Sequence, residues 1–77
     1  MEKTFDKIIA QKIDNLRVLK GFSFRELATN SGISHSTLSD IIQGKTIPNI
    51  LTLHSICTAL EVSLSDFFNP DEEVLML

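Results

Sequence analysis

The sequence lacks the features that mark secreted, disulfide-bonded or membrane-spanning proteins. It contains a single cysteine, Cys57, no tryptophan and no tyrosine, and one cysteine cannot form an internal disulfide. No apolar run approaches the roughly 18 residues needed to span a membrane. Residues 1–7 mix both charge signs where a signal peptide would have an apolar stretch. We therefore expect a cytoplasmic protein.

Glycine and proline are also scarce, with three glycines and two prolines in the chain. The chain length of 77 residues suffices for one compact domain. The hydrophobic fraction of 43% and the mean hydropathy of +0.14 are typical of globular proteins. The sequence has no strand pattern, internal repeat or Gly/Ser linker. Its few glycines and prolines fall where helical patterns stop, which favours an all-α fold.

Basic residues are absent after Lys45. Residues 1–45 hold all seven Lys and Arg against five of the ten acids, whereas residues 46–77 hold the other five acids and no base. The net charge of -3 does not exclude binding to a polyanion, because affinity depends on the local potential of the docking face. It does predict modest non-specific binding.

Apolar residues recur at helical spacing along the whole chain. A first helix, with the stripe Phe5, Ile9, Ile13 and Leu16, is expected to end near Lys20–Gly21. A second follows a capping box at Ser23–Glu26 and runs to about Asn30. A third covers about 34–43, with Ser34 as its N-cap.

Two further helices are expected in the uncharged and acidic part of the chain. The fourth starts at Pro48–Asn49, and its stripe is Ile50, Leu53, Ile56, Cys57 and Leu60. The fifth begins at a second capping box, residues 63–66, contains Phe67 and Phe68, and stops at Asn69–Pro70. We expect all the aromatic residues other than Phe24 to be core residues.

The pair of short helices around Gly32 is the most informative unit. Two helices that dock within a few residues need a small residue at the crossing and a permissive backbone in the turn. Ala28 and Gly32 meet these needs. The residues expected to face the core are Leu27, Ile33, Leu38 and Ile41.

This pattern resembles the Cro/repressor-type (XRE) helix-turn-helix family. The matching motifs are Ser23-Phe24-Arg25-Glu26-Leu27-Ala28, the run from Ser34 to Lys45, Leu16-Arg17 before them, and Pro48, Thr52-Leu53, Ile56, Ala59-Leu60 and Val62 to Phe68 after them. The resemblance covers roughly residues 9–69. It implies a bacterial or phage protein with a compact five-helix, repressor-like DNA-binding domain, residues 1–70, in which the second and third helices form the helix-turn-helix. An acidic and apolar tail, residues 71–77, follows.

The resemblance also implies which residues meet double-stranded DNA. The third helix would lie in the major groove and read bases with His35, Ser36, Ser39 and Asp40. Phosphate contacts would come from Ser23, Phe24, Arg25, Ser34, Thr37, Gln43, Lys45 and Thr46. For His35 the alternative is a solvated side chain at the helix end. For Asp40 a solvated acid is an equally good interpretation, because phosphates repel a carboxylate.

Three positions depart from the family pattern. Phe24 stands where a Gln that bridges phosphate to the recognition helix is usual. Ile42 replaces a Glu that often pairs with the Arg matched by Arg17. We expect Arg17 to meet Glu26 or Glu61 instead, or to be solvated. Glu61 replaces the usual Gly after the fourth helix, which costs strain if the backbone there is left-handed.

The motifs present in the sequence favour some classes of function over others. A transcription regulator, most simply a repressor, is favoured by the motif order. The alternative is a protein-interaction module of antitoxin or antirepressor type, supported by Asp40, Ile42 and Phe24. An enzyme is not expected, because no nucleophile with a base, metal set or phosphate-binding loop is evident. His54 and Cys57 are too few for a zinc site, and we expect Cys57 to serve packing. We expect no cofactor, metal, small-molecule ligand or membrane.

A single domain of this kind reads a half-site, so we expect a homodimer on a palindromic operator. The candidate interface is the C-terminal end with the apolar residues 74–77, or else the N-terminal turns around Phe5, Ile8 and Ile9.

Removal of residues 71–77 should shift the protein towards the monomer in sedimentation equilibrium. An unchanged sedimentation profile would contradict an interface at the C-terminal end, and a disordered tail is the alternative.

Overall fold

The computed structural model describes residues 2–69, and the side chains of residues 7–69. This part of the chain consists of α1 (Glu2–Lys20), α2 (Phe24–Ser31), α3 (His35–Ile42), α4 (Ile50–Ala59) and α5 (Leu64–Phe67), with no strand. The expected all-α, five-helix architecture is therefore confirmed. The tail, residues 71–77, and the side chain of Phe5 lie outside the described residues.

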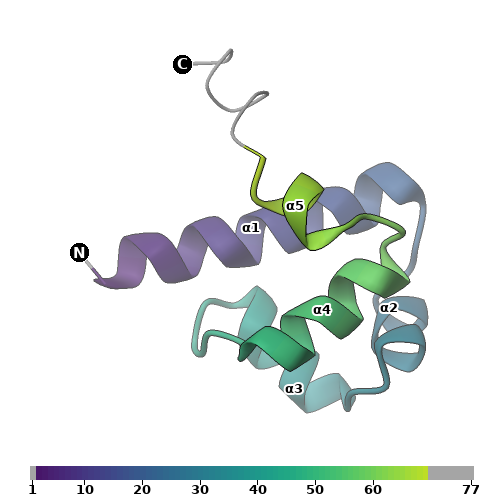
Figure 1. Cartoon of the computed structure of the whole chain (residues 1–77). Helices are drawn as coiled ribbons and strands as arrows, with labels where there is room; N and C mark the ends of the chain where they lie inside the picture. The colour runs from purple at the N-terminus through teal and green to yellow at the C-terminus, as the bar shows by residue number, and fades with distance from the viewer. Residues whose placement is uncertain (1, 70–77) are drawn as a thin grey trace.

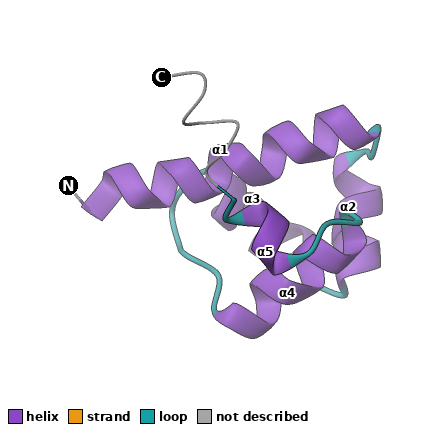
Figure 2. Ribbon diagram, turned by 45° about the horizontal axis from the view of Figure 1, so that its top comes forward, coloured by secondary structure: helices purple, strands orange, loops and turns teal. Residues whose placement is uncertain are grey.

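Helix α1 is the longest element of the described chain. It runs across the whole molecule, and α2, α3 and α4 gather on one side of it (Figures 1 and 2). The Lys12 ammonium of α1 lies 5.7 Å from the centroid of the Phe67 ring of α5. Helix α2 packs against α3 and α4, and α3 also packs against α1. The two halves of the helix-turn-helix are thus each held by a different neighbour.

A single apolar core joins the helices. Its most deeply buried members come from every helix and are Ile13, Leu27, Ala28, Leu38, Ile41, Ile56, Cys57, Leu60 and Phe67. Leu16, Phe22 and Ile33 pack against this core from partly buried positions. The predicted core residues of α2 and α3 are therefore confirmed, with Ile33 at the edge.

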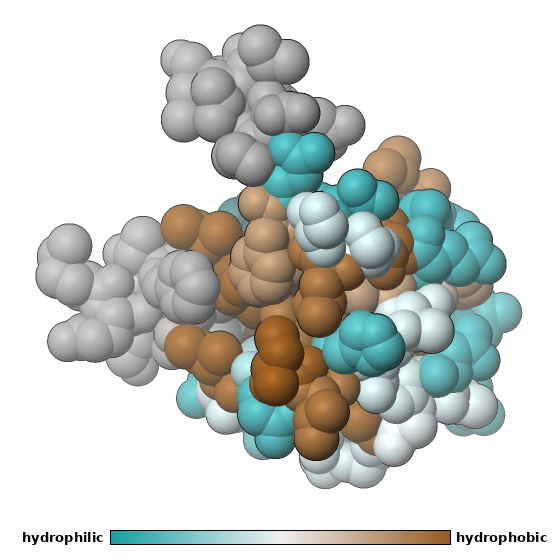
Figure 3. Space-filling model, in the orientation of Figure 1, coloured by the Kyte–Doolittle hydropathy of each residue, from teal (hydrophilic) through white to brown (hydrophobic). Residues whose placement is uncertain are grey.

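Two apolar residues expected in the core lie at the surface. Ile50 is 61% exposed and Phe68 is 49% exposed. Ile50 is the first residue of α4, and within the same stripe burial begins at Leu53, which is 5% exposed. Phe68 is the C-cap of α5 and packs edge-on against the buried Phe67, with ring centroids 5.1 Å apart. Figure 3 shows apolar side chains exposed over α4 on this face of the molecule.

Side-chain caps set the starts of the four shorter helices. In each, the N-cap side chain accepts a hydrogen bond from the backbone N–H three residues later; these caps are Ser23, Ser34, Asn49 and Ser63. The capping box at Ser23–Glu26 is complete, because the Glu26 carboxylate also accepts from the Ser23 N–H. These caps explain why the predicted starts agree with the observed ones within about a residue.

The turn after α4 places a side chain in left-handed backbone. Glu61 has φ 66°, the only positive φ outside glycine in the described chain. Its N–H donates to the Thr58 carbonyl at 3.0 Å, and the Val62 N–H donates to the Cys57 carbonyl at 2.9 Å. This is the hydrogen-bonded helix end that glycine usually occupies, so the strain anticipated at this position is present.

Glu61→Gly should stabilise the fold. Relief of the left-handed strain is worth about 0.5–1 kcal/mol after the entropy that glycine adds to the unfolded chain. Urea denaturation measures the difference in the free energy of unfolding. Glu61→Ala is the matched control, because it removes the same carboxylate and keeps the strained backbone. An equal gain in both variants would show that the charge, and not the backbone, is responsible.

Candidate nucleic-acid interface

The outward face of α3 is built from the four residues expected to read bases. His35, Ser36 and Asp40 are exposed and Ser39 is partly exposed, whereas Leu38 and Ile41 on the opposite face are buried. Positions 35, 36, 39 and 40 are neighbours on a helix surface because they are separated by one turn. The helix therefore presents two hydroxyls, an imidazole and a carboxylate together.

Three hydroxyls meet at the N-terminus of α3. The Ser34 Oγ accepts from the Thr37 N–H at 3.1 Å, and its hydroxyl lies 2.9 Å from Thr37 Oγ1 and 3.2 Å from Ser36 Oγ. All three residues are exposed. A helix N-terminus combines free N–H groups with a partial positive charge, so hydroxyls placed there suit an anionic oxygen such as phosphate.

Phe24, the first residue of α2, holds the neighbouring start of α3 through an aromatic contact. Its ring packs partly against the core and lies edge-on to the His35 imidazole, with centroids 5.5 Å apart and an interplanar angle of 79°. An edge-on pair of this kind restricts the orientation of both rings. Phe24 thus contacts the recognition helix, as the usual Gln would, but its ring offers no hydrogen bond to phosphate.

The C-terminal end of α3 also has a fixed side chain. The Gln43 amide donates to Ser39 Oγ at 2.7 Å. Gln43 is the C-cap of α3, and Lys45 and Thr46 follow it at exposed positions. The Lys45 N–H donates to the Asp40 carbonyl at 2.9 Å, which ties this loop back to the helix.

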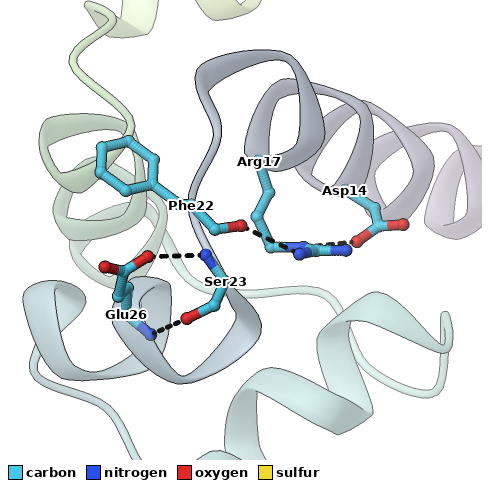
Figure 4. Close-up of polar contacts among 5 residues, drawn as sticks. All are labelled: Asp14, Arg17, Phe22, Ser23 and Glu26. Carbon is cyan, nitrogen blue, oxygen red and sulfur yellow. Dashed lines mark hydrogen bonds and ion pairs between the residues drawn. The ribbon is translucent and has the colours of Figure 1, made fainter.

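Arg17 joins α1 to the loop that leads into α2 (Figure 4). Its Nε donates to Asp14 Oδ1 at 2.9 Å, and its Nη1 donates to the Phe22 carbonyl at 3.0 Å. The expected pairing with Glu26 or Glu61, or with solvent, is therefore wrong. Glu26 is engaged in its capping box, and Asp14 lies one turn before Arg17 on the same helix face. The i, i+3 spacing of Asp14 and Arg17 was the sequence signal for this pair.

The Cys57 side chain belongs to the buried core, whereas the His54 side chain is exposed. The thiol is buried, and burial raises its pKa, which keeps it protonated and unreactive. His54 is exposed on the outer side of α4. The placement of Cys57 agrees with the packing interpretation.

Comparison with known proteins identifies the family. The family model named Helix-turn-helix matches residues 13–67, most of the chain. The chain belongs to this helix-turn-helix family, of the XRE type. It is a family of transcription regulators and not of enzymes.

Two of the matched relatives are longer transcriptional regulators. The chain is 36% identical over 63 residues to the HTH-type transcriptional regulator PuuR of Escherichia coli K12, covering 82% of this chain and 34% of PuuR. It is 39% identical over 70 residues to the HTH-type transcriptional regulator SlrR of Bacillus subtilis 168, covering 90% of this chain and 45% of SlrR. It thus spans between a third and a half of these relatives.

Two further matches cover nearly all of this chain. The HTH-type transcriptional regulator y4dJ of Sinorhizobium fredii is 31% identical over 67 residues, which is 87% of each protein. The crystal structure of an HTH_3 family transcriptional regulator from Vibrio cholerae superposes with a TM-score of 0.82 at 36% identity, covering 97% of this chain and 42% of the other. Among the described residues, none of the helices has the length and hydrophobicity of a membrane span.

All twelve predicted site residues fall into three groups, along the helix-turn-helix and the segment that follows it. The start of α2 holds Ser23, Phe24 and Arg25. The start and outer face of α3 hold Ser34, His35, Ser36, Thr37, Ser39 and Asp40. The segment after α3 holds Gln43, Lys45 and Thr46. Their individual roles in DNA binding stay predictions.

Arg17→Lys should destabilise the domain by about 1 kcal/mol, because a single ammonium cannot reproduce the two divergent donors that reach Asp14 and the Phe22 carbonyl. The free energy of unfolding in urea measures this loss. Arg25→Lys is the matched control, since Arg25 is exposed and such surface changes usually stay within about 0.5 kcal/mol. Equal stabilities of the two variants would mean that Arg17 does not hold the loop.

Proposed function

We propose that this chain binds double-stranded DNA in a sequence-specific manner and regulates transcription, as a repressor that acts as a homodimer on a palindromic operator. The observation that supports this most is the outer face of α3. It presents His35, Ser36, Ser39 and Asp40 to solvent beside the capped start of α2, in a chain that belongs to the helix-turn-helix family.

The side chains of α3 differ in what they can read. Because Ser39 Oγ accepts from the Gln43 amide, its own proton is free to be donated to a base. The major-groove acceptors to which the Ser39 hydroxyl could donate are guanine O6 and N7, adenine N7 and thymine O4. Asp40 can only accept when ionised, which suits the cytosine amino group. Contact between Phe24 and His35 limits the directions in which the imidazole can point.

Phosphate contacts would fix the register of α3 in the groove. The free N–H groups and hydroxyls at the starts of α2 and α3 and the cations of Arg25 and Lys45 supply them. Phe24 contributes only its backbone N–H. With one side-chain contact fewer than the family pattern and an acidic chain overall, we expect weak non-specific binding and a larger share of affinity from bases.

A second candidate function is a protein-interaction module of antitoxin or antirepressor type. The observation in its favour is that α3 carries an exposed carboxylate, Asp40, and no Lys or Arg. Ile42 gives it less support, because its side chain packs partly against the core. Salt separates the two functions, since DNA affinity falls steeply with rising salt and an apolar protein interface responds little.

The test is selection of bound duplexes from a randomised pool at two salt concentrations, followed by sequencing. We expect enrichment of a two-fold symmetric motif. His35→Ala or Ser39→Ala should weaken binding to it by roughly 1–3 kcal/mol and relax preference at one position in each half-site. Ser65→Ala, an exposed serine on α5, is the control and should bind as the unchanged protein does. No enrichment at low salt would contradict the proposed function and favour the protein-interaction module.

A further inference from the structure

The starts of α2 and α3 meet at an aromatic pair. Phe24 is the first residue of α2 and His35 is the first residue of α3. Their rings lie edge-on, with centroids 5.5 Å apart. Phe24 is partly buried against the core, whereas His35 is exposed. The pair therefore joins a ring held by the scaffold to a ring at the surface of the recognition helix.

The Phe24 ring adds apolar surface to a region that is otherwise polar. Two helix N-termini converge here, and their free N–H groups and partial positive charge favour an anionic oxygen. Ser23 and Ser34 cap these two helix starts with hydroxyls. The Phe24 ring has no hydrogen-bond donor or acceptor, so it bonds neither phosphate nor a polar base edge. Its uncovered surface gains only from contact with another apolar group.

The major groove of DNA offers one apolar group of this kind on its base edges. All base pairs present hydrogen-bonding atoms there, and thymine adds its C5-methyl group. A recognition helix contacts base edges with its N-terminal residues, which is where the aromatic pair lies. We infer that Phe24, supported by His35, reads the methyl group of a thymine at the base pair faced by the start of α3. This inference rests on the proposed function and names one base of the operator.

The polar side chains of α3 do not select thymine by themselves. Hydroxyls such as those of Ser36 and Ser39 bond to any base. The helix carries no Lys or Arg, the side chains that most often select guanine. A contact with the C5-methyl group separates thymine from guanine, adenine and cytosine, because these three bases lack it. Phe24 thus supplies a preference that the exposed polar residues leave open.

Phe24 is held in place without DNA. Its ring packs against the core and against the His35 imidazole. The capping box fixes the backbone at the start of α2, because the Glu26 N–H donates to Ser23 Oγ at 3.0 Å and the Ser23 N–H donates to Glu26 Oε1 at 2.8 Å. A side chain that is already ordered loses little further entropy on binding. Burial of one methyl group against it then corresponds to about a fourfold gain in affinity.

The experiment replaces each thymine of the selected operator with deoxyuridine, one at a time. Uracil lacks only the C5-methyl group, so its hydrogen-bonding atoms are those of thymine. In fluorescence anisotropy, the unchanged protein should bind about fourfold more weakly when the thymine read by Phe24 is replaced. A C·G pair at that position should weaken binding further, and 5-methylcytosine in that pair should regain about fourfold.

Phe24→Ala tests which residue reads the methyl group. The ratio of the affinities for thymine and uracil at the sensitive position should fall from about four towards one. This ratio compares two duplexes with the same protein, so a general change in stability or affinity cancels. Phe68→Ala is the matched control, because Phe68 is a 49% exposed phenylalanine outside the helix-turn-helix. It should keep the ratio of the unchanged protein.

The outcomes separate this inference from the proposed function. Sequence-selective binding with equal affinity for thymine and uracil at every position overturns the reading of the methyl group and leaves the proposed function standing. A thymine preference that survives Phe24→Ala also overturns the inference. Its loss in Thr37→Ser, which removes a methyl group and keeps the hydroxyl, would then assign the contact to Thr37. Failure to select any duplex at low salt overturns the proposed function and this inference together.

Discussion

Helices α2 and α3 can cross only because the chain reverses direction within three residues, and that reversal determines which side chains face outward. Gly32 makes it in left-handed backbone, with φ 73°, a conformation that a β-carbon disfavours. The Ile33 N–H closes the turn onto the Ala28 carbonyl at 3.1 Å. Ala28 is itself fully buried, which permits the close approach. Burial of Leu38 and Ile41 then leaves positions 35, 36, 39 and 40 on the outside.

Contacts with α1 help to position the starts of α2 and α3, the two helix ends that would face DNA in the proposed complex. Arg17 links Asp14 to the Phe22 carbonyl, so the end of α1 is tied to the residue before the Ser23 cap. Phe24 then contacts His35 across the gap between α2 and α3. A continuous set of contacts thus runs from the scaffold helix to the first residue of the recognition helix. Rigid support of this kind limits the entropy that ordering on DNA would cost.

Local chemistry explains what the sequence predicts well. The starts of the short helices, the turn at Gly32 and the buried faces of α2 and α3 depend on caps, backbone freedom and helical period, all readable over a few residues. The partner of Arg17 was predicted wrongly because several carboxylates were candidates and only the tertiary arrangement assigns Glu26 to its own cap. The exposure of Ile50 and Phe68 escaped prediction for a related reason. Both lie at helix ends, where periodicity does not say how far a neighbouring helix extends.

The distribution of charge gives the proposed complex its orientation and part of its specificity. In the proposed complex the basic first half of the chain would face the phosphates, and the acids from Glu61 onward would be repelled away from the DNA. Asp40 is the exception, since it is exposed on α3 itself. Phosphates repel this carboxylate at any site where it finds no donor. In the proposed complex this cost would be offset only opposite an amino donor such as that of cytosine or adenine, so Asp40 would act mainly by penalising other sequences.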